Sequence, residues 1–392
     1  MLKNKNILIV ALIAVVNALG YGIIIPILYS YSQKFGLSDF QNGLLFSVFS
    51  ICQFVATPVI GRLSDKYGRK PLLVISLVGT LVSFLMMAFA RNGWWLFLAR
   101  ALDGITAGNI PVAQAVISDS TEPHERAKGF GIIGASFGFG FVFGPAISAL
   151  TLGWGANVPF LVAACITLIA VLLTQFILPE TNKHKGLVEH KELFNFAHLW
   201  HSLMDPQVGV TLFMTFLFSM ALSMFIYAFQ PFSVKILHLT AQQISSMFII
   251  FGAAGLIAQV FMIPRAIKFF GERKMLTISL LTAIFTFSSM FFVHSYMFFI
   301  VVSIVQSLAN AFVNPLLQAL LSKEVDAQSQ GSIMGVSASY MSLGMIIGPI
   351  IGGGLATFTI PLPFLGGALT VLLCFILSMR IPKKLPQKVD VF

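Results

Sequence analysis

Charged side chains are scarce in this sequence, and so are cysteines. Only 10% of the 392 residues are charged, whereas an ordinary soluble domain carries about 25%, so a soluble enzyme is excluded. The three cysteines, Cys52, Cys165 and Cys374, all lie inside apolar stretches and form neither a disulfide framework nor a metal-ligand spacing. No nucleophile–base pair and no metal or cofactor cluster stands out in the sequence. We therefore expect neither an enzyme nor a cofactor-binding protein.

The positive charge is not placed as in a nucleic-acid-binding protein. The formal net charge is +10, but the cations fall in short loops beside apolar runs rather than in one patch. That arrangement is typical of the loops of a membrane protein. The lipid bilayer, and not a nucleic acid, is therefore the expected large partner.

Apolar runs make up most of the chain. The sequence is 57% hydrophobic, its mean hydropathy is +0.91, and about 20 apolar residues are enough to cross a bilayer as a helix. The first run is too long for a signal-peptide core, so we interpret it as a retained helix. The sequence thus predicts an all-α integral membrane protein with twelve transmembrane helices. The predicted spans are roughly 7–28, 42–61, 71–90, 94–117, 128–152, 157–178, 208–231, 243–264, 275–293, 296–320, 332–358 and 362–381.

The distribution of cations predicts the orientation. With both termini inside, 20 of the 24 Lys and Arg residues fall on the inner side, three fall on the outer side, and Arg100 lies within a span. Cytoplasmic loops carry such an excess of cations. We therefore expect a multi-pass protein of the plasma (inner) membrane, with both termini and the polar 179–207 segment in the cytoplasm.

The chain also repeats itself at a long period. Two six-helix halves related this way are typical of transporters, whose site lies between the halves near the bilayer midplane; a duplicated but static membrane protein is the alternative. We assign 1–180 and 208–392 to two six-helix bundles, and 181–207 to a cytoplasmic linker with an interfacial helix over 189–204. The recurring residues are Pro111, Ser118, Gly131, Gly140, Gly144 and Pro145, which return 204 positions later as Pro315, Ser322, Gly335, Gly344, Gly348 and Pro349.

A basic turn between the second and third spans carries a motif. Residues 61–71 read Gly-Arg-Leu-Ser-Asp-Lys-Tyr-Gly-Arg-Lys-Pro. They resemble the loop 2–3 signature of the major facilitator superfamily, Gly-x-Leu-x-Asp-x-x-Gly-Arg-Lys, at every defined position, although an ordinary basic loop is the alternative. The resemblance implies a fold of two pseudo-symmetric six-helix bundles, and a latch in which Asp65, held by Arg69, closes the inner side near the start of the eleventh span. A degenerate second copy has Lys268 where Asp65 would align.

A glycine–proline pattern marks the fifth span. Glycines four residues apart, Gly140 and Gly144, let a neighbouring helix approach closely, and Pro145 bends the helix. Together with Gly131 earlier in the span, these residues resemble the antiporter signature of drug and tetracycline exporters. Ser148 and Ala149 replace its final glycine pair, and both are small. The resemblance favours export over import and gives these three residues a role in the conformational cycle.

The fourth span contains the only deep charges that the sequence predicts. Arg100 and Asp103 are three residues apart and share a helix face, and ionisable groups at that depth need a cavity or a partner. The pair is either a proton or substrate site or a self-neutralising contact that fixes helix packing, and the sequence leaves both open. In the first span, Asn17 stands where the exporters' pattern has an acid, so Asp103 is the predicted coupling group.

Polar residues within other spans outline a predicted substrate cavity. The tenth span carries amides at intervals of four, and such side chains face a wet cavity or helix partners rather than lipid. With 39 phenylalanines and 16 methionines, a large pocket with few polar anchors suits a lipophilic organic compound. The predicted cavity residues are Asn17, Tyr21, Gln114, Tyr227, Gln230, Gln306, Asn310, Asn314 and Tyr340.

Together with the family resemblance, these features predict a monomeric secondary transporter. Its expected partners are protons and a small lipophilic compound, which it exports by alternating access. Import of a small metabolite by proton symport, or uncoupled facilitation, is the alternative. A membrane receptor or sensor built on a transporter frame is a further alternative outside transport.

Overall fold

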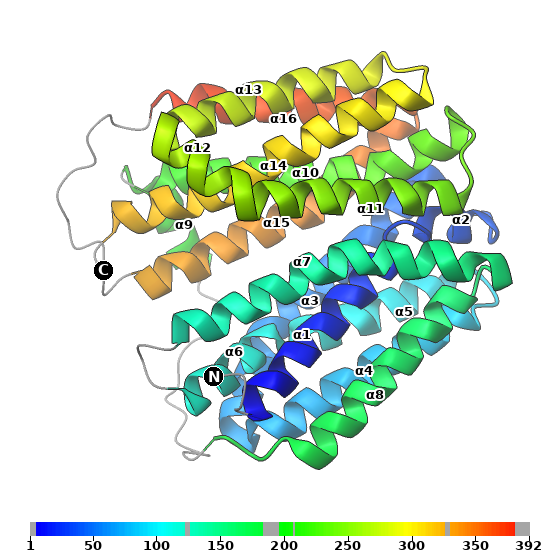
Figure 1. Cartoon of the computed structure of the whole chain (residues 1–392), viewed down its shortest axis with the longest axis vertical. Helices are drawn as coiled ribbons and strands as arrows, with labels where there is room; N and C mark the ends of the chain where they lie inside the picture. Colours follow the sequence, from blue (N-terminus) through cyan, green and yellow to red (C-terminus); the bar gives the residue numbers. More distant parts are fainter. Residues whose placement is uncertain (1–4, 122–125, 183–195, 207, 326–329, 381–392) are drawn as a thin grey trace. The chain divides into compact units, whose positions relative to one another are not determined.

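The computed structural model describes residues 5–121, 126–182, 196–206, 208–325 and 330–380. Within these ranges the chain is helical and contains no strand. It divides into two compact units, whose helices are labelled in Figure 1. Unit 1 comprises Met1–Ser38, Val48–Phe194 and Thr240–Ile249, and unit 2 comprises Asp39–Ser47, Asn195–Leu239 and Ile250–Phe392.

The helices of the first half of the chain belong to unit 1, apart from the first turns of α3. They are α1 (Lys5–Ile24), α2 (Leu28–Gln33), α3 (Asp39–Tyr67), α4 (Arg69–Ala88), α5 (Gly93–Thr106), the 3-10 helix η1 (Ala107–Asn109), α6 (Ile110–Ser120), α7 (Arg126–Thr151), the 3-10 helix η2 (Leu152–Trp154) and α8 (Val158–Ile177).

The helices of the second half belong to unit 2, apart from the first turns of α11. They are α9 (Phe196–Met204), α10 (Gly209–Lys235), α11 (Ala241–Ile257), the π-helix η3 (Ala258–Met262), α12 (Ile263–Phe270), α13 (Glu272–Phe291), α14 (Tyr296–Glu324), α15 (Gln330–Ala356) and α16 (Leu362–Ser378).

The predicted membrane crossings are confirmed. Among the described residues, eight helices are long and apolar enough to cross a membrane, and three shorter apolar helices lie at 138–154, 241–257 and 362–378. The twelfth crossing is the fourth predicted span, which is broken into α5, η1 and α6. Pro111 explains the break, because it lies in the first turn of α6 and has no backbone N–H to continue the preceding helix.

Three predicted elements differ in detail from the sequence interpretation. The first span ends at Ile24, just before Pro26, and α2 follows as a separate short helix. The eighth span changes to a π-helix at Ala258 and then to α12. Of the linker helix predicted over 189–204, the part from Phe196 to Met204 is helical, and residues 189–195 lie outside the described ranges.

The internal repeat is visible in the packing of each unit. In unit 1, α1 packs on α7, α4 on α8, and α4 on α5. The corresponding helices of unit 2 pack in the same way: α10 on α15, α13 on α16, and α13 on α14. Glycines permit the closest of these contacts, because a Cβ atom on Gly144 would lie 2.6 Å from the carbonyl carbon of Gly22, and one on Gly344 would lie 2.6 Å from the carbonyl oxygen of Phe216.

Corresponding tight turns connect the second and third crossings of each half. Gly68 between α3 and α4 has φ 113°, and Gly271 between α12 and α13 has φ 76°. Glycine adopts such angles at little cost because it has no Cβ. The turns bring the charged residues on both sides of each glycine to the ends of two neighbouring helices.

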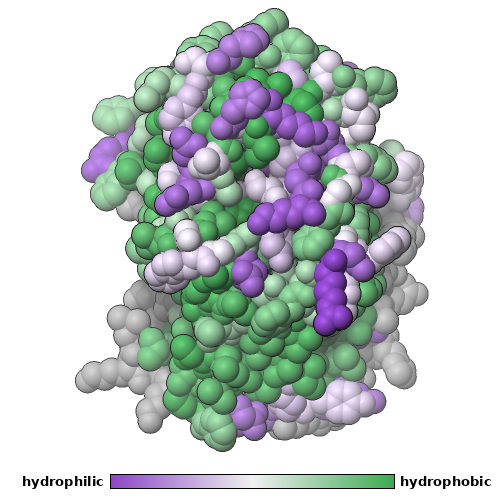
Figure 2. Space-filling view, turned by 90° about the vertical axis from the view of Figure 1, so that its right-hand side faces the viewer, coloured by the Kyte–Doolittle hydropathy of each residue, from purple (hydrophilic) through white to green (hydrophobic). Residues whose placement is uncertain are grey.

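Large hydrophobic side chains remain exposed along several helices. Phe176 of α8 is 79% exposed, Phe285 of α13 is 72% exposed and Leu369 of α16 is 63% exposed. On the face drawn in Figure 2, hydrophobic residues form broad continuous areas, with hydrophilic residues between them and at the lower edge. Extensive apolar exposure of this kind suits contact with lipid chains.

Candidate functional site

A buried ion pair lies in the middle of unit 1. Arg100 and Asp103 of α5 are 1% and 6% exposed, and an Nη1 atom of the arginine lies 2.9 Å from Oδ2 of the aspartate. The guanidinium carbon also lies 4.2 Å from the centre of the Phe49 ring, a cation–π distance. Nε of Arg100 has no hydrogen-bond partner among the described residues. The predicted pairing of these two residues is therefore present, and one donor of the arginine remains unused.

The break in the fourth crossing adds polar groups beside this pair. The Thr106 and Thr80 hydroxyls lie 3.0 Å apart, which links α5 to α4. The Asn17 amide of α1 donates to Oδ1 of Asn109 at 2.9 Å. Asn109 is fully buried, and its own amide nitrogen has no partner among the described residues. Since a buried unpaired donor is costly, this amide is available to a ligand that brings an acceptor.

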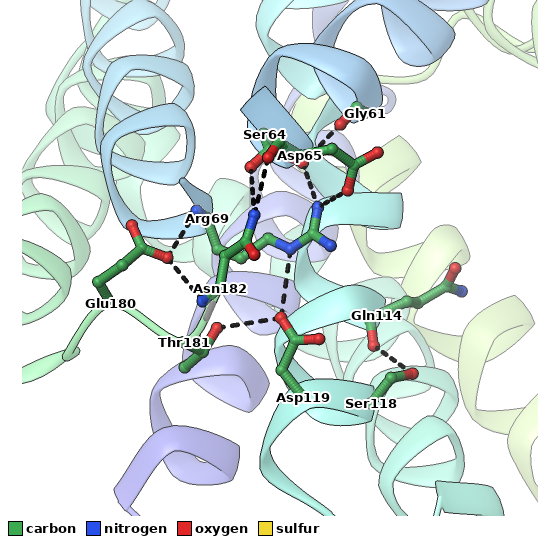
Figure 3. A network of polar contacts seen from close by, with 10 residues as sticks. All are labelled: Gly61, Ser64, Asp65, Arg69, Gln114, Ser118, Asp119, Glu180, Thr181 and Asn182. Atoms are coloured by element: carbon green, nitrogen blue, oxygen red, sulfur yellow. Dashed lines mark hydrogen bonds and ion pairs between the residues drawn. The ribbon is translucent and has the colours of Figure 1, made fainter. Parts of the chain in front are cut away.

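Two of the predicted cavity residues of unit 1 belong to this cluster, and one does not. The Tyr21 ring lies 6.0 Å from Phe49 and 6.0 Å from Phe141, between centroids. Tyr21 of α1 therefore lies against Phe49, the ring that contacts Arg100, and Asn17 of α1 bonds to Asn109. Gln114 is exposed on α6, where its backbone carbonyl accepts from the Ser118 hydroxyl (Figure 3), and its side chain makes no hydrogen bond with Arg100 or Asp103.

Unit 2 carries an amide network between α13 and α14, the helices that correspond to α4 and α5 of unit 1. Gln306 of α14 is fully buried, accepts a hydrogen bond from the Thr286 hydroxyl of α13, and donates to Oδ1 of Asn310 at 2.9 Å. The amide nitrogen of Asn310 is buried and has no partner among the described residues. Asn314, one turn further, is half-buried and makes no hydrogen bond with a described residue. Within the predicted polar stripe, the Asn310 amide nitrogen and the Asn314 side chain thus have no hydrogen-bond partner among the described residues.

The other predicted cavity residues of unit 2 are held by the protein itself. The Tyr227 hydroxyl donates to the Asp39 carbonyl at 2.7 Å, and the Asp39 carboxylate pairs with Lys235 at 2.8 Å. Gln230 is fully buried in α10. The Tyr340 hydroxyl donates to the Leu199 carbonyl at 2.8 Å and so ties α15 to the linker helix α9. These contacts fix helix packing in unit 2.

The predicted latch motif forms a network at one end of unit 1 (Figure 3). An Nη1 atom of Arg69 lies 2.5 Å from Oδ1 of Asp65, and Nε lies 3.3 Å from Oδ2 of Asp119. The Arg69 backbone N–H donates to Glu180 at 2.9 Å, and the Asn182 amide donates to the Asp65 carbonyl at 2.9 Å. Arg69 therefore holds Asp65, as predicted, and also joins α3, α4, α6 and the segment after α8.

One functional candidate was missed by the sequence interpretation. We expected Asp103 to be the only deep carboxylate, but Glu324 at the end of α14 is 2% exposed. Its Oε1 accepts from the Thr211 hydroxyl at 2.8 Å, while Oε2 is buried without a partner among the described residues. No Lys or Arg of the described ranges lies within ion-pair distance of it. Its position beside Lys323 at the end of a span gave no sequence signal of burial.

Metal ligands do not gather anywhere in the described ranges. No group of three His, Cys, Asp or Glu residues is close enough to hold an ion there. The buried polar chemistry described above is therefore that of the Arg100–Asp103 ion pair, the Glu324 carboxyl and several amides and hydroxyls.

Comparison with known proteins identifies the family. A family model of the Major Facilitator Superfamily matches residues 10–210 and again residues 211–390. The chain is 30% identical over 369 residues to "Multidrug resistance protein 2" of Bacillus subtilis (strain 168), covering 93% of this chain and 92% of that protein. It is 31% identical over 357 residues to "Tetracycline resistance protein, class C" of Escherichia coli, covering 89% of each.

The fold agrees with solved structures of the same kind. The crystal structure of the nucleoside transporter NupG matches with a TM-score of 0.79 at 14% identity, over 97% of this chain and 100% of that one. At such low identity the likeness concerns the fold alone. Because the family model matches each repeat in turn and together the matches cover nearly the whole chain, the protein belongs to the Major Facilitator Superfamily and is a membrane transporter rather than an enzyme.

Proposed function

We propose that the protein exports a small lipophilic organic compound in exchange for protons, by alternating access of its two six-helix bundles. The names of the relatives, which refer to multidrug and tetracycline resistance, support export of such compounds over import of a metabolite. The bundles are residues 1–180 and 208–392, joined by the 181–207 linker. The protein works as a monomer in the plasma membrane, with both termini in the cytoplasm.

The observation that carries proton coupling is the buried Arg100–Asp103 pair. A carboxyl group that takes part in coupling must exchange a proton while the substrate enters or leaves. Asp103 is buried, and a single guanidinium 2.9 Å away balances its charge. Neutralising Asp103 frees Arg100, and a bound cation competes with Arg100 for the carboxylate. Proton and substrate binding at this pair are thus mutually exclusive, which is the requirement for exchange.

The amides supply recognition of the substrate. Asn109 in unit 1 and Asn310 in unit 2 each present a buried amide nitrogen without a partner among the described residues. Both donate to an acceptor such as a carbonyl or ether oxygen. Tyr21 and Phe49 add aromatic surface beside the ion pair. Asn17 and Gln306 orient the two donors, and Asn314 extends the stripe in unit 2.

The remaining predicted residues serve the conformational cycle. Asp65 and Arg69 act as the latch at the cytoplasmic end of the second crossing. Gly140, Gly144 and Pro145 allow α7 to move against α1 while the two stay in close contact.

Transport in vesicles tests this function directly. Purified protein is reconstituted into vesicles whose interior is made acidic, and tetracycline or a fluorescent lipophilic cation is added outside. Proteins inserted with the cytoplasmic face outward accumulate the compound while the pH difference lasts and release it when a protonophore is added. Accumulation that persists after the protonophore is added contradicts proton coupling. Failure to accumulate every lipophilic compound tested contradicts export.

A further inference from the structure

The latch motif of unit 1 has a counterpart in unit 2 in which three charges are inverted. At each of three positions, an acid in one unit corresponds to a base in the other, 203 or 204 residues apart along the chain. Two neighbouring residues keep their type: Arg62 corresponds to Arg265, and Gly68 corresponds to Gly271. The triad of unit 1 is Asp65, Arg69 and Asp119, and the triad of unit 2 is Lys268, Glu272 and Lys323.

One contact of the triad survives the inversion. In unit 1, Nε of Arg69 lies 3.3 Å from Asp119 and joins the start of α4 to the end of α6. In unit 2, Nζ of Lys323 lies 2.6 Å from Oε2 of Glu272 and joins the end of α14 to the start of α13. The structural role of this ion pair does not depend on which helix carries the acid.

The third member of the triad does not keep its contact. Asp65 is bound by Arg69 at 2.5 Å. Lys268 occupies its place, but it makes no ion pair with any residue of the described ranges. Arg265 and Lys274 are likewise exposed without an ion-pair partner there, and Arg265 donates only to the Phe261 carbonyl at 2.7 Å. The inversion therefore leaves an excess of positive charge at this end of unit 2.

The same end of unit 2 also exposes aromatic side chains. Phe269 is 80% exposed and Phe270 is 55% exposed, directly after Lys268 in α12. By length and composition, the candidate membrane span of α13 begins at Glu272, and that of α14 ends at Glu324. The cations and the phenylalanines thus lie at the level where helices leave the apolar part of a bilayer, where headgroups and the upper acyl chains meet.

We propose that the basic surface of unit 2, defined as Arg265, Lys268, Phe269, Phe270 and Lys274, binds an anionic phospholipid. The three cations bind the phosphate and the negatively charged headgroup, and the two rings pack against the acyl chains. A free phosphate ion would gain nothing from the exposed rings, so a lipid is the better fit. The corresponding end of unit 1 does not bind in this way, because Asp65, Asp119 and Glu180 offset three of the four cations of residues 61–71.

Native mass spectrometry of the purified full-length protein tests the proposal. The protein is titrated in a neutral detergent with phosphatidylglycerol, with phosphatidylcholine of the same acyl chains, and with inorganic phosphate. The test variant is Arg265→Gln/Lys268→Gln, and the matched control is Arg62→Gln/Lys66→Gln at the corresponding end of unit 1. All substituted side chains are at least partly exposed, and equal melting temperatures establish that both variants are folded.

The two variants have different expected outcomes. Each cation near a membrane surface strengthens anionic-lipid binding by about fivefold, so the test variant loses about 25-fold in affinity for phosphatidylglycerol and the control changes by less than about twofold. The wild type binds phosphatidylcholine and inorganic phosphate much more weakly. Equal losses in both variants, equal binding of the two lipids, or phosphatidylglycerol binding unaffected by the test variant would each overturn the proposal.

Discussion

Corresponding helices of the two units carry different polar chemistry. The interior of unit 1 holds a charged pair, Arg100 and Asp103, whereas the interior of unit 2 holds the neutral chain Thr286, Gln306 and Asn310. The backbones repeat, and the helix pairs that pack together are the same. The difference therefore lies in side chains on a shared frame and not in the frame.

This difference indicates that the two units have different roles in transport. A buried ion pair stores a strong interaction that one proton can cancel, whereas an amide network keeps its hydrogen bonds at any ordinary pH. We therefore assign proton coupling to unit 1 and substrate orientation mainly to unit 2. Variants in corresponding parts of the two units test that assignment.

The largest effect is expected at the ion pair. Asp103→Asn removes the titratable group and leaves Arg100 without a counter-charge, so accumulation driven by a pH difference falls to the level of protein-free vesicles. Binding of an uncharged compound, and its exchange between equal concentrations, persist because such a compound does not compete with Arg100 for the carboxylate. Accumulation by Asp103→Asn vesicles under a pH difference would place the coupling group elsewhere, with Asp65 or Asp119 as the next candidates.

A double variant separates the coupling role from the structural one. Removing one partner of a buried ion pair costs about 3–5 kcal/mol, but replacing both partners with apolar side chains is often neutral. Arg100→Met/Asp103→Leu is therefore expected to melt near the wild-type temperature and yet not to pump. If the double variant pumps normally, the pair only fixes helix packing.

The next largest effect concerns the close helix contacts, which both units share. Gly144→Leu places a branched side chain against Gly22, and Gly348→Leu places one against α10. Overpacking of this kind costs about 1–3 kcal/mol. Both variants are expected to insert into the membrane and to lose transport. Transport is measured in vesicles of the same composition for both variants. If only one of the two loses transport, the two corresponding contacts do not have the same function.

The sequence predicted the frame better than the contacts within it. The crossings follow from runs of apolar residues, and the pairing of Arg100 with Asp103 follows from their spacing of three along one helix. Contacts between distant segments had no such local signal: Asn17 bonds to Asn109, 92 residues away, and Tyr340 bonds to the linker helix.

Glu324 shows most clearly why the rest could not be predicted. An acid beside a lysine at the end of a span is ordinarily solvated. Here the carboxyl group is buried because α10 places Thr211 against it. That packing is a property of the tertiary structure, and neither the hydropathy nor the charge pattern of α14 contains it.

A smaller effect is expected in the amide network of unit 2. Asn310→Leu removes the donor that has no partner among the described residues and also the oxygen that accepts from Gln306. The loss of one hydrogen bond to the substrate, of about 1–1.5 kcal/mol, raises the KM for substrate about five- to tenfold. The pH dependence of transport should not change. Gln318→Leu, at the exposed end of the same stripe, is the control. A coupling defect in Asn310→Leu would refute the division between the units.

The latch is expected to respond still more weakly. Asp65 is half-exposed, so its ion pair with Arg69 contributes only about 0.2–1 kcal/mol. Asp65→Asn should therefore slow turnover a few-fold by favouring the inward-open state, with substrate affinity unchanged. Fluorescence from labels placed at the cytoplasmic ends of the bundles reports that population. Turnover equal to that of the wild type would mean that Asp65 is not a latch.

The smallest effect compares the two buried acids. Asp103 has a cation beside it, but Glu324 has none within ion-pair distance in the described ranges, and Asp205, the other charged group that acts on it, is also an acid. Glu324→Gln removes the uncompensated charge and keeps an oxygen to accept from Thr211. At neutral pH it should raise the free energy of unfolding by about 1 kcal/mol, whereas Asp103→Asn lowers it. In the wild type, protonation of Glu324 at acid pH also removes this charge. The melting temperatures of the wild type and Glu324→Gln should therefore converge as the pH falls. A constant difference across pH would show that Glu324 binds its proton equally well in the folded and the unfolded protein, so that burial does not disfavour its charge.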